Sequence, residues 1–469
     1  MAEKEVYIPE HYGNKISTVD NEGKRKWVYA FQPKGKYYKY RTWLSWLYYA
    51  IFFTLPFIKI NGIPFLMLNI PKGEFSIFGK MFFPQDFIIL GIGMVLGVVF
   101  IYVFTLIFGR VFCGWICPQT IFMEMMFRKI EFWIEGPAHK QMQIARKKEK
   151  STDYYIRKII KHIIFFTLSF IISNTFLAYI IGVDEVFRIA TEPVSMHIIG
   201  FISILIFTII FYTVFAFIRE IVCTVICPYG RLQSVLMDKK SKAVVYDYNR
   251  GEPRSKKRKD DTAKGDCIDC GMCVNVCHTG IDIRDGLQME CVGCTACMDA
   301  CDDMMLRVGL PPKLITIASQ HQLETNTVGQ SSWDLRAKLL ITLLAILTIG
   351  FTTIVLTRPI FDATLMRVPG QIYQEHDDGT VTNLYKIIIV SKSAKTLPFD
   401  MKVEENFAQI EYVTGKSYDS LQSGNNPQIT FFVRVPSDKI SSRKMHIHVQ
   451  ILSGDKVIQT KKVSFLSSY

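Results

Sequence analysis

The chain of 469 residues is long enough for several domains, and 49% of its residues are hydrophobic although 21% are charged. Its mean hydropathy is slightly positive, which indicates long apolar segments that alternate with polar ones. A net charge of +13 is typical of proteins that bind nucleic acid and of membrane proteins with basic cytoplasmic loops. Because the sequence holds no nucleic-acid motif and no basic surface interleaved with aromatic residues, we expect a lipid bilayer and no nucleic acid as its partner.

Residues 1–41 are polar and carry nine Lys and Arg. They contain no short apolar core followed by a cleavage site, so we expect a tail that is not a cleaved signal peptide. Five apolar runs come later in the chain, each near the ~20 residues that cross a bilayer. These predicted membrane spans lie at 42–60, 86–108, 160–182, 198–218 and 336–356.

The basic residues predict the orientation of these spans. Lys and Arg number ten in 109–158 and fifteen in 219–335, but only two in 61–85 and one in 183–197. Because basic loops stay in the cytoplasm, the N-terminal tail, 109–158 and 219–335 are predicted to be cytoplasmic, and the chain after the fifth span external.

Two short motifs of the form C-x3-C-P end the second and fourth spans. Cys113 and Cys117 precede one proline, and Cys223 and Cys227 precede another 110 residues later, which indicates a duplicated unit of two helices. Cysteines at i and i+4 are expected to share a helix face and to bind one ion together. The four thiols either converge on one site or form one site per pair. Copper binding, dithiol redox chemistry and a third iron–sulfur centre remain open, beside the alternative of buried cysteines that only pack.

The remaining cysteines form two runs of the form C-x2-C-x2-C-x3-C, the ligand pattern of a two-cluster bacterial ferredoxin. In this pattern the fourth cysteine of each run binds the other cluster. Zinc is the alternative, but zinc sites favour separated C-x2-C pairs. His278 and Asp302 stand where a proline usually follows each run. We predict one [4Fe–4S] cluster on Cys267, Cys270, Cys273 and Cys301, and a second on Cys291, Cys294, Cys297 and Cys277.

All twelve cysteines lie between positions 113 and 301, on the side predicted to be cytoplasmic. Since that compartment is reducing, the distribution favours metal ligands over disulfides. The basic stretch 236–265 is interpreted as a solvated linker near anionic lipid headgroups.

After Arg358 the sequence changes to strand-length runs separated by turn residues such as "DDGT" and "SGNNP". About 110 residues with this spacing are typical of a β-sandwich, most simply an immunoglobulin-like one. The fold class is therefore a multi-domain membrane protein: five spans, an inserted cytoplasmic ferredoxin-like domain and a C-terminal immunoglobulin-like β-sandwich. Its predicted parts are the tail 1–41, four helices in 42–235, linker and ferredoxin domain in 236–335, the fifth helix 336–357 and the external domain 358–469.

Several segments resemble the cytochrome oxidase accessory family called CcoG, FixG or RdxA, a family of membrane polyferredoxins. They include "FGRVFCGWICPQTIFMEMMFRKIEFWIEG", "REIVCTVICPYGRLQSVLMD" and "RPIFDATLMR". The resemblance extends from about residue 40 to the end. It implies the same five spans in a bacterial inner membrane, with the ferredoxin domain in the cytoplasm and the last domain in the periplasm.

The resemblance also implies an oxidoreductase that reduces Cu(II) to Cu(I) during assembly of cbb3-type oxidase. The expected partners are oxidase subunits or copper chaperones and a cytoplasmic electron donor. The catalytic and copper-binding role falls on Cys113, Cys117, Cys223 and Cys227. Two rivals remain: a quinol-linked ferredoxin subunit of a respiratory reductase, and a non-redox scaffold for oxidase assembly.

Overall fold

The computed structural model describes residues 25, 27–60, 62–71, 73–82, 86–255, 265–329, 335–357, 361–370, 372–391, 397–413, 420–421, 427–454 and 456–468. Most of the predicted tail and the most basic part of the linker lie outside these residues. The chain forms two compact units. The first comprises Met1–Thr54, Gly91–Leu177 and Val186–Gly350, and the second Leu55–Leu90, Ala178–Glu185 and Phe351–Tyr469.

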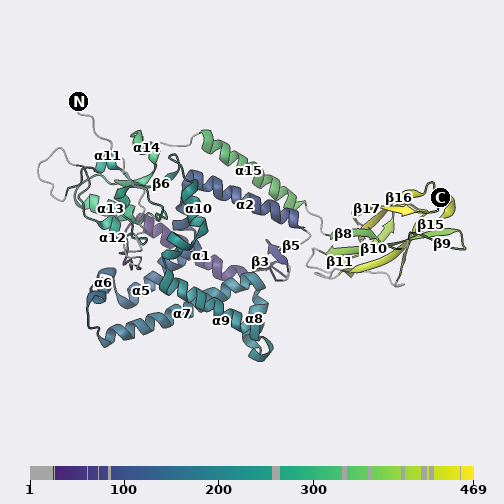
Figure 1. Ribbon diagram of the computed structural model, residues 1–469, viewed down its shortest axis with the longest axis horizontal. Helices are drawn as coiled ribbons and strands as arrows, with labels where there is room; N and C mark the ends of the chain where they lie inside the picture. The colour runs from purple at the N-terminus through teal and green to yellow at the C-terminus, as the bar shows by residue number, and fades with distance from the viewer. Residues whose placement is uncertain are drawn as a thin grey trace. The chain divides into compact units, whose positions relative to one another are not determined.

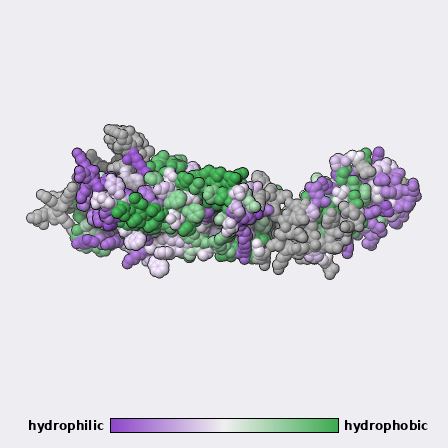
Figure 2. Space-filling view, turned by 90° about the horizontal axis from the view of Figure 1, so that it is seen from below, coloured by the Kyte–Doolittle hydropathy of each residue, from purple (hydrophilic) through white to green (hydrophobic). Residues whose placement is uncertain are grey.

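Long helices make up most of the first unit (Figure 1). Four helices of the described residues are long and apolar enough to cross a bilayer: α2 (Phe87–Phe108), α7 (Thr152–Ile181), α9 (Ile198–Thr213) with its extension η5 (Val214–Ile218), and α15 (Leu335–Leu356). Many of their apolar side chains are more than half exposed, Ile88 and Ile199 among them. Figure 2 shows this helical part with broad hydrophobic surface, as expected of helices that face lipid.

The first predicted span differs from the other four. Residues 42–60 belong to α1 (Lys36–Thr54), a 3-10 turn, Leu55–Phe57, and a two-residue strand, β1 (Lys59–Ile60). Helix α1 is not among the four helices apolar enough to span. Its first turns carry Lys36, Lys39 and Arg41, and many of its other side chains are Tyr, Trp, Ser or Thr, which lowers its hydropathy.

Aromatic side chains hold α1, α7 and α9 around the segment after the first C-x3-C-P motif. The Phe127 ring stacks on Phe215 at 4.6 Å between centroids and meets Phe165 edge-on at 4.9 Å. Tyr49 of α1 packs on Phe122, and its hydroxyl donates to the carbonyl oxygen of Ile121. This buried cluster fixes the position of the π-helix η3 (Ile121–Phe127).

The backbone supports the duplication indicated by the sequence. Gly109 and Arg219, which are 110 positions apart, both have positive φ, +60° and +54°. Pro118 and Pro228 each begin a helix, α4 (Pro118–Thr120) and α10 (Pro228–Leu236). The two motifs therefore share a residue with positive φ before the first cysteine and a helix start after the second.

One expectation about the motifs is wrong. Cys113 lies in the short helix α3 (Val111–Trp115), but Cys117 has extended backbone angles, φ −57° and ψ 126°. Cys223 lies in the π-helix η6 (Val222–Ile226), and Cys227 is extended in the same way. A residue that precedes proline is disfavoured in the α-helical region, so the second cysteine of each motif leaves the helix instead of sharing its face.

The cysteine runs lie in a small α/β part of the first unit. Strand β6 (Lys242–Tyr246) pairs antiparallel with β7 (Ile315–Ser319). Val244, Val245 and Tyr246 are buried, so this part of the stretch 236–265 belongs to the folded domain and is not a solvated linker. Between the strands come the helices α11 (Tyr248–Gly251), α12 (Met272–Asn275) and α13 (Ala296–Arg307), and α14 (Gln320–Glu324) follows β7.

The second unit contains the predicted β-sandwich. The strand-length runs predicted after Arg358 include β10 (Thr380–Ser391), β15 (Gln428–Pro436), β16 (Lys444–Ser453) and β17 (Lys456–Leu466). One sheet has the order β13-β15-β10-β8 with β9 beside β10, and another β12-β16-β17. Alternate residues of β15 and β16 face a common apolar core, and the Tyr385 hydroxyl donates to the Ser464 carbonyl oxygen across it. The remaining strands of this domain are β8 (Phe361–Arg367), β9 (Gln374–Glu375), β11 (Leu397–Pro398), β12 (Asp400–Val403), β13 (Gln409–Tyr412) and β14 (Ser420–Leu421).

Candidate functional site

The first predicted set of cluster ligands surrounds a cavity of its own. Cys267, Cys270, Cys273 and Cys301 line it together with apolar side chains of β7 and α13. Gly271 has φ +68°, which turns the chain sharply between the second and third cysteines of the run. Cys270 is exposed, whereas Cys273 is buried. This cavity is therefore reached from solvent through the Cys270 loop.

The second predicted set lines a neighbouring cavity. Cys277, Cys291, Cys294 and Cys297 all border it, as do Cys273 and His278. Helix α13 carries Cys297 toward this cavity and Cys301, one turn later, toward the other. Each run thus contributes its fourth thiol to the partner cavity, as the ferredoxin pattern predicts.

The chemistry of both cavities fits an iron–sulfur cluster. Their walls are thiols and mostly apolar groups, and a cubane binds to thiolates that each hold a separate iron. The individual ligand assignments remain predictions.

The two C-x3-C-P motifs come together although they are far apart in the sequence. Negative charge on Cys117, Cys113 or Cys227 would raise the pKa of Cys223, so all four thiols lie within electrostatic range of one another. Burial raises the pKa of Cys113 to about 11 and that of Cys223 to about 12. Without a metal ion Cys113 and Cys223 stay protonated at neutral pH, and a bound soft metal ion would supply the charge that lets them ionise.

Side chains from α10 complete the thiol site. The Cys113 thiol donates to Gln233 Oε1 at 2.9 Å, and Gln233 Nε2 in turn donates to the Tyr229 hydroxyl at 2.8 Å. Thr120 Oγ1 lies 3.9 Å from the Cys223 sulfur. Gln233 therefore connects the helix after the second motif to the first cysteine of the first motif.

The first motif lies directly against the loop of the second cavity. A Cβ atom on Gly114 would stand 2.7 Å from the Cα of Cys294 and 2.7 Å from the carbonyl oxygen of Val292. Cys113, Val292 and Cys294 belong to one buried cluster. The absence of a side chain at Gly114 thus allows the thiol site and the second predicted cluster site to share a wall.

Arg110 lies between the two C-x3-C-P motifs and the segment that precedes the second cysteine run. Its guanidinium donates to the carbonyl oxygen of Met289, just before the second cysteine run, and lies beside Cys113 and Gly230. Its side chain is buried. A buried cation at this point favours negative charge on both the thiol site and the neighbouring loop.

His278 stands where a proline usually follows the first cysteine run. It also lines the second cavity, at the wall shared with the thiol site. It is buried between Cys294 and Glu124 of η3. Burial alone would raise the pKa of Cys294, but the charge and hydrogen bond of His278 lower it to about 7. The histidine therefore favours the thiolate form that a cluster ligand needs.

A buried ionic network includes Arg219, which precedes the second C-x3-C-P motif. Arg219 Nη2 lies 2.8 Å from Glu131 Oε2, and Lys161 Nζ lies 3.2 Å from Glu131 Oε1. Burial would raise the pKa of Glu131, but these two cations lower it to about 2. Sequence reasoning missed Arg110, Glu131 and Arg219. The position of Arg110 and Arg219 just after apolar runs was a signal, since charges there are rarely without a role.

Comparisons with known proteins match three parts of the chain to described domains. A family model described as a 4Fe-4S dicluster domain matches residues 218–320, and one described as a 4Fe-4S binding domain matches 90–137. A third, described as an IG-like fold at the C-terminal of FixG, matches 351–468. Two iron–sulfur binding domains and the immunoglobulin-like domain are thereby confirmed. Both C-x3-C-P motifs fall within the iron–sulfur matches.

Three relatives match most of the chain. Protein RdxA of Cereibacter sphaeroides is 29% identical over 80% of this chain and 82% of its own length. Protein RdxB of the same organism is 28% identical over 81% and 82%. The nitrogen fixation protein FixG of Rhizobium meliloti is 25% identical over 90% and 86%.

The contact at Gly114 generates a test of the shared wall. We expect Gly114→Val to displace the Cys291–Cys294 loop, because its Cβ would fall on backbone atoms that cannot rotate away. Iron content should fall by up to about half, and the electron paramagnetic resonance signal of one reduced cluster should be lost or altered. The matched control is Gly97→Val, since a Cβ there meets nothing within 4 Å. Two unchanged cluster signals in Gly114→Val would contradict the described contact.

Proposed function

The chain belongs to the FixG/RdxA family of iron–sulfur electron-transfer proteins, and on that premise we propose that it reduces Cu(II) to Cu(I) at its C-x3-C-P thiols. The Cu(I) would serve the assembly of a cbb3-type oxidase. The single observation that carries the proposal is the wall that Gly114 and Cys113 share with the second cysteine cavity. An electron that reaches this cavity has the thiol site as its immediate neighbour.

Two [4Fe–4S] clusters, when bound, would supply one-electron transfer between the exposed Cys270 loop and this wall. The chain's own residues would provide the approach for the electron donor and the ligands for copper. Cys270 lies where a soluble donor in the cytoplasm can approach, and Cys113, Cys117, Cys223 and Cys227 offer soft ligands to copper. Cu(II) gains one electron and becomes Cu(I), for which thiolates have the higher preference, so reduction also tightens binding. Cys113 and Cys223 release their protons as the ion binds, as their raised pKa values require.

The orientation forms part of the proposal. The distribution of Lys and Arg supports cysteine sites in the cytoplasm and a β-sandwich in the periplasm. This needs a fifth crossing, for which α1 is the candidate: its 19 residues extend about 28 Å, close to the ~30 Å of a bilayer core. In the periplasm the β-sandwich would be available to oxidase subunits or a copper chaperone.

The copper reaction is tested with anaerobically purified, full-length protein. After reduction with dithionite and removal of the excess, added Cu(II) should reoxidise the protein, seen as recovery of its visible absorbance, while a Cu(I) chelator reports the product. Protein with its clusters already oxidised measures the background from thiols alone. Reoxidation only by a quinone would support the quinol-linked relay instead, and a failure of the clusters to reduce would support the scaffold.

A pair of substitutions separates the thiol site from the clusters. Cys113→Ser with Cys223→Ser should keep both ferredoxin clusters and their resonance signals but lose nearly all cluster-dependent Cu(I) formation, because one soft ligand is removed from each motif. The contrasting variant Cys273→Ser should lose a cluster and about half of the iron. Unchanged copper turnover in the double variant would remove the thiols from the reaction.

Reporter proteins at the two ends test the number of crossings. Five crossings put the ends on opposite sides: green fluorescent protein should fluoresce at the N-terminus, and alkaline phosphatase should be active at the C-terminus. Four crossings, with α1 lying outside the bilayer, would put both ends on one side. The same reporter active at both ends would therefore refute the fifth span.

A further inference from the structure

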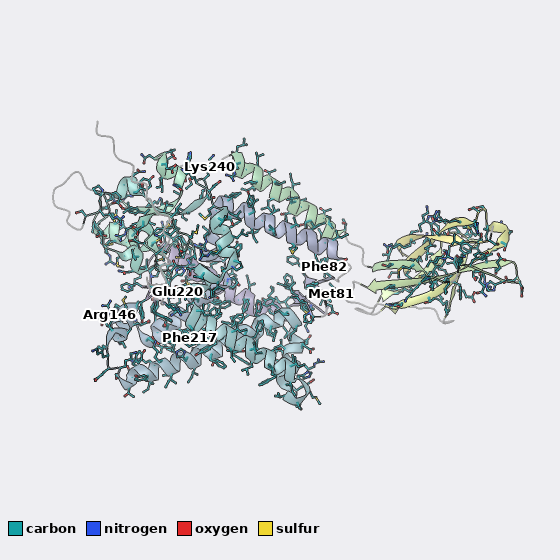
Figure 3. All side chains as sticks on the ribbon, viewed as in Figure 1. Met81, Phe82, Arg146, Phe217, Glu220 and Lys240 are labelled. Carbon is teal, nitrogen blue, oxygen red and sulfur yellow. The ribbon has the colours of Figure 1, made fainter. Side chains whose placement is uncertain are left out.

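A second site lies at the N-terminal end of α7, away from the cysteines. A cavity of about 360 Å³ is enclosed by α5 (Arg128–Glu135), α6 (Ala138–Arg146), the following loop and the first two turns of α7. Figure 3 labels Arg146, which ends α6 beside it. This volume is in the range of cavities that bind small molecules.

The cavity has an excess of positive charge. Two of its basic side chains are neutralised: Arg157 pairs with Asp153 at 2.8 Å and Lys158 with Glu135 at 2.9 Å. Three further lysines, Lys140, Lys147 and Lys150, also line it, and none of them has a carboxylate partner among the described residues. Glu149 is the only lining carboxylate, among the described residues, without an ion pair. The cavity therefore fits an anion.

The surroundings favour an anion with an apolar tail. Helix α7 is apolar enough to cross a bilayer, and the cavity opens at its polar end. Ile160 and Ile164 come three and seven residues after Arg157, so they continue along the same side of the helix. Ile160 is 43% exposed. Ile144 and the aliphatic stems of the lysines add apolar wall inside the cavity.

We propose that this cavity binds the phosphodiester headgroup of an anionic phospholipid, with Lys140, Lys147 and Lys150 around the phosphate and an acyl chain along Ile160 and Ile164. Basic pockets beside membrane helices recognise anionic headgroups in this way. The site joins α5 and α6, which directly follow the first C-x3-C-P segment, to the membrane surface. It does not depend on the copper reaction, because its residues are separate from all twelve cysteines.

The test uses full-length protein in a neutral detergent, with bound lipid counted by native mass spectrometry. Phosphatidylglycerol should bind about tenfold or more tightly than phosphatidylcholine, and Lys140→Gln/Lys147→Gln/Lys150→Gln should remove this preference. The triple Lys→Arg variant should retain it. Lys444→Gln/Lys461→Gln/Lys462→Gln in the β-sandwich makes the same change of charge elsewhere and should also retain it. Iron content reports that each variant is folded.

Three results would overturn the proposal. They are equal binding of the two lipids, full retention of phosphatidylglycerol by a folded triple Gln variant, and complete displacement of the lipid by millimolar inorganic phosphate. The last result would identify a site for free phosphate groups rather than for a lipid.

Discussion

The close approach of the first C-x3-C-P motif to the Cys291–Cys294 loop is the constraint on which the site depends. It requires that residue 114 have no side chain, since a Cβ would stand 2.7 Å from main-chain atoms of the loop. Main-chain atoms cannot move aside by a change of rotamer, so any larger residue must separate the two elements. The contact converts two cysteine groups that are distant in the sequence into one continuous region of thiols.

Burying ionised thiols in this region costs free energy, and the surrounding charged side chains offset this cost. Arg110, His278 and Glu124 lie around the shared wall, while Glu131, Arg219 and Lys161 form a compact ionic group behind the second motif. Arg219 holds φ at +54°, a conformation that costs a non-glycine residue about 1 to 3 kcal/mol. Its ion pair with Glu131 and the ring of Trp27 above its guanidinium hold it there. Charged residues at apolar helix ends thus act as structural supports for the motifs.

Some of this arrangement could be predicted from the sequence because it depends on local spacing. Three cysteines with two residues between each pair form a tight loop, so the cysteine runs predicted which thiols would gather around each cavity. Alternating apolar residues likewise predicted β15 and β16. The path of Cys117 was not predicted, because its i+4 spacing suggested a helix while Pro118 excluded the helical conformation one residue earlier. Contacts such as those of Gly114, Gln233 and Arg110 depend on packing between distant segments, which no local pattern encodes.

Whether thiolate sulfur binds iron in this chain is the central question, and metal and sulfide analysis of anaerobically purified protein answers it most directly. Two [4Fe–4S] clusters with a thiol site for copper predict about eight iron ions and about eight acid-labile sulfides per chain. Zinc without sulfide would contradict the electron path entirely. About twelve iron ions would show that the C-x3-C-P thiols hold a cluster in place of copper.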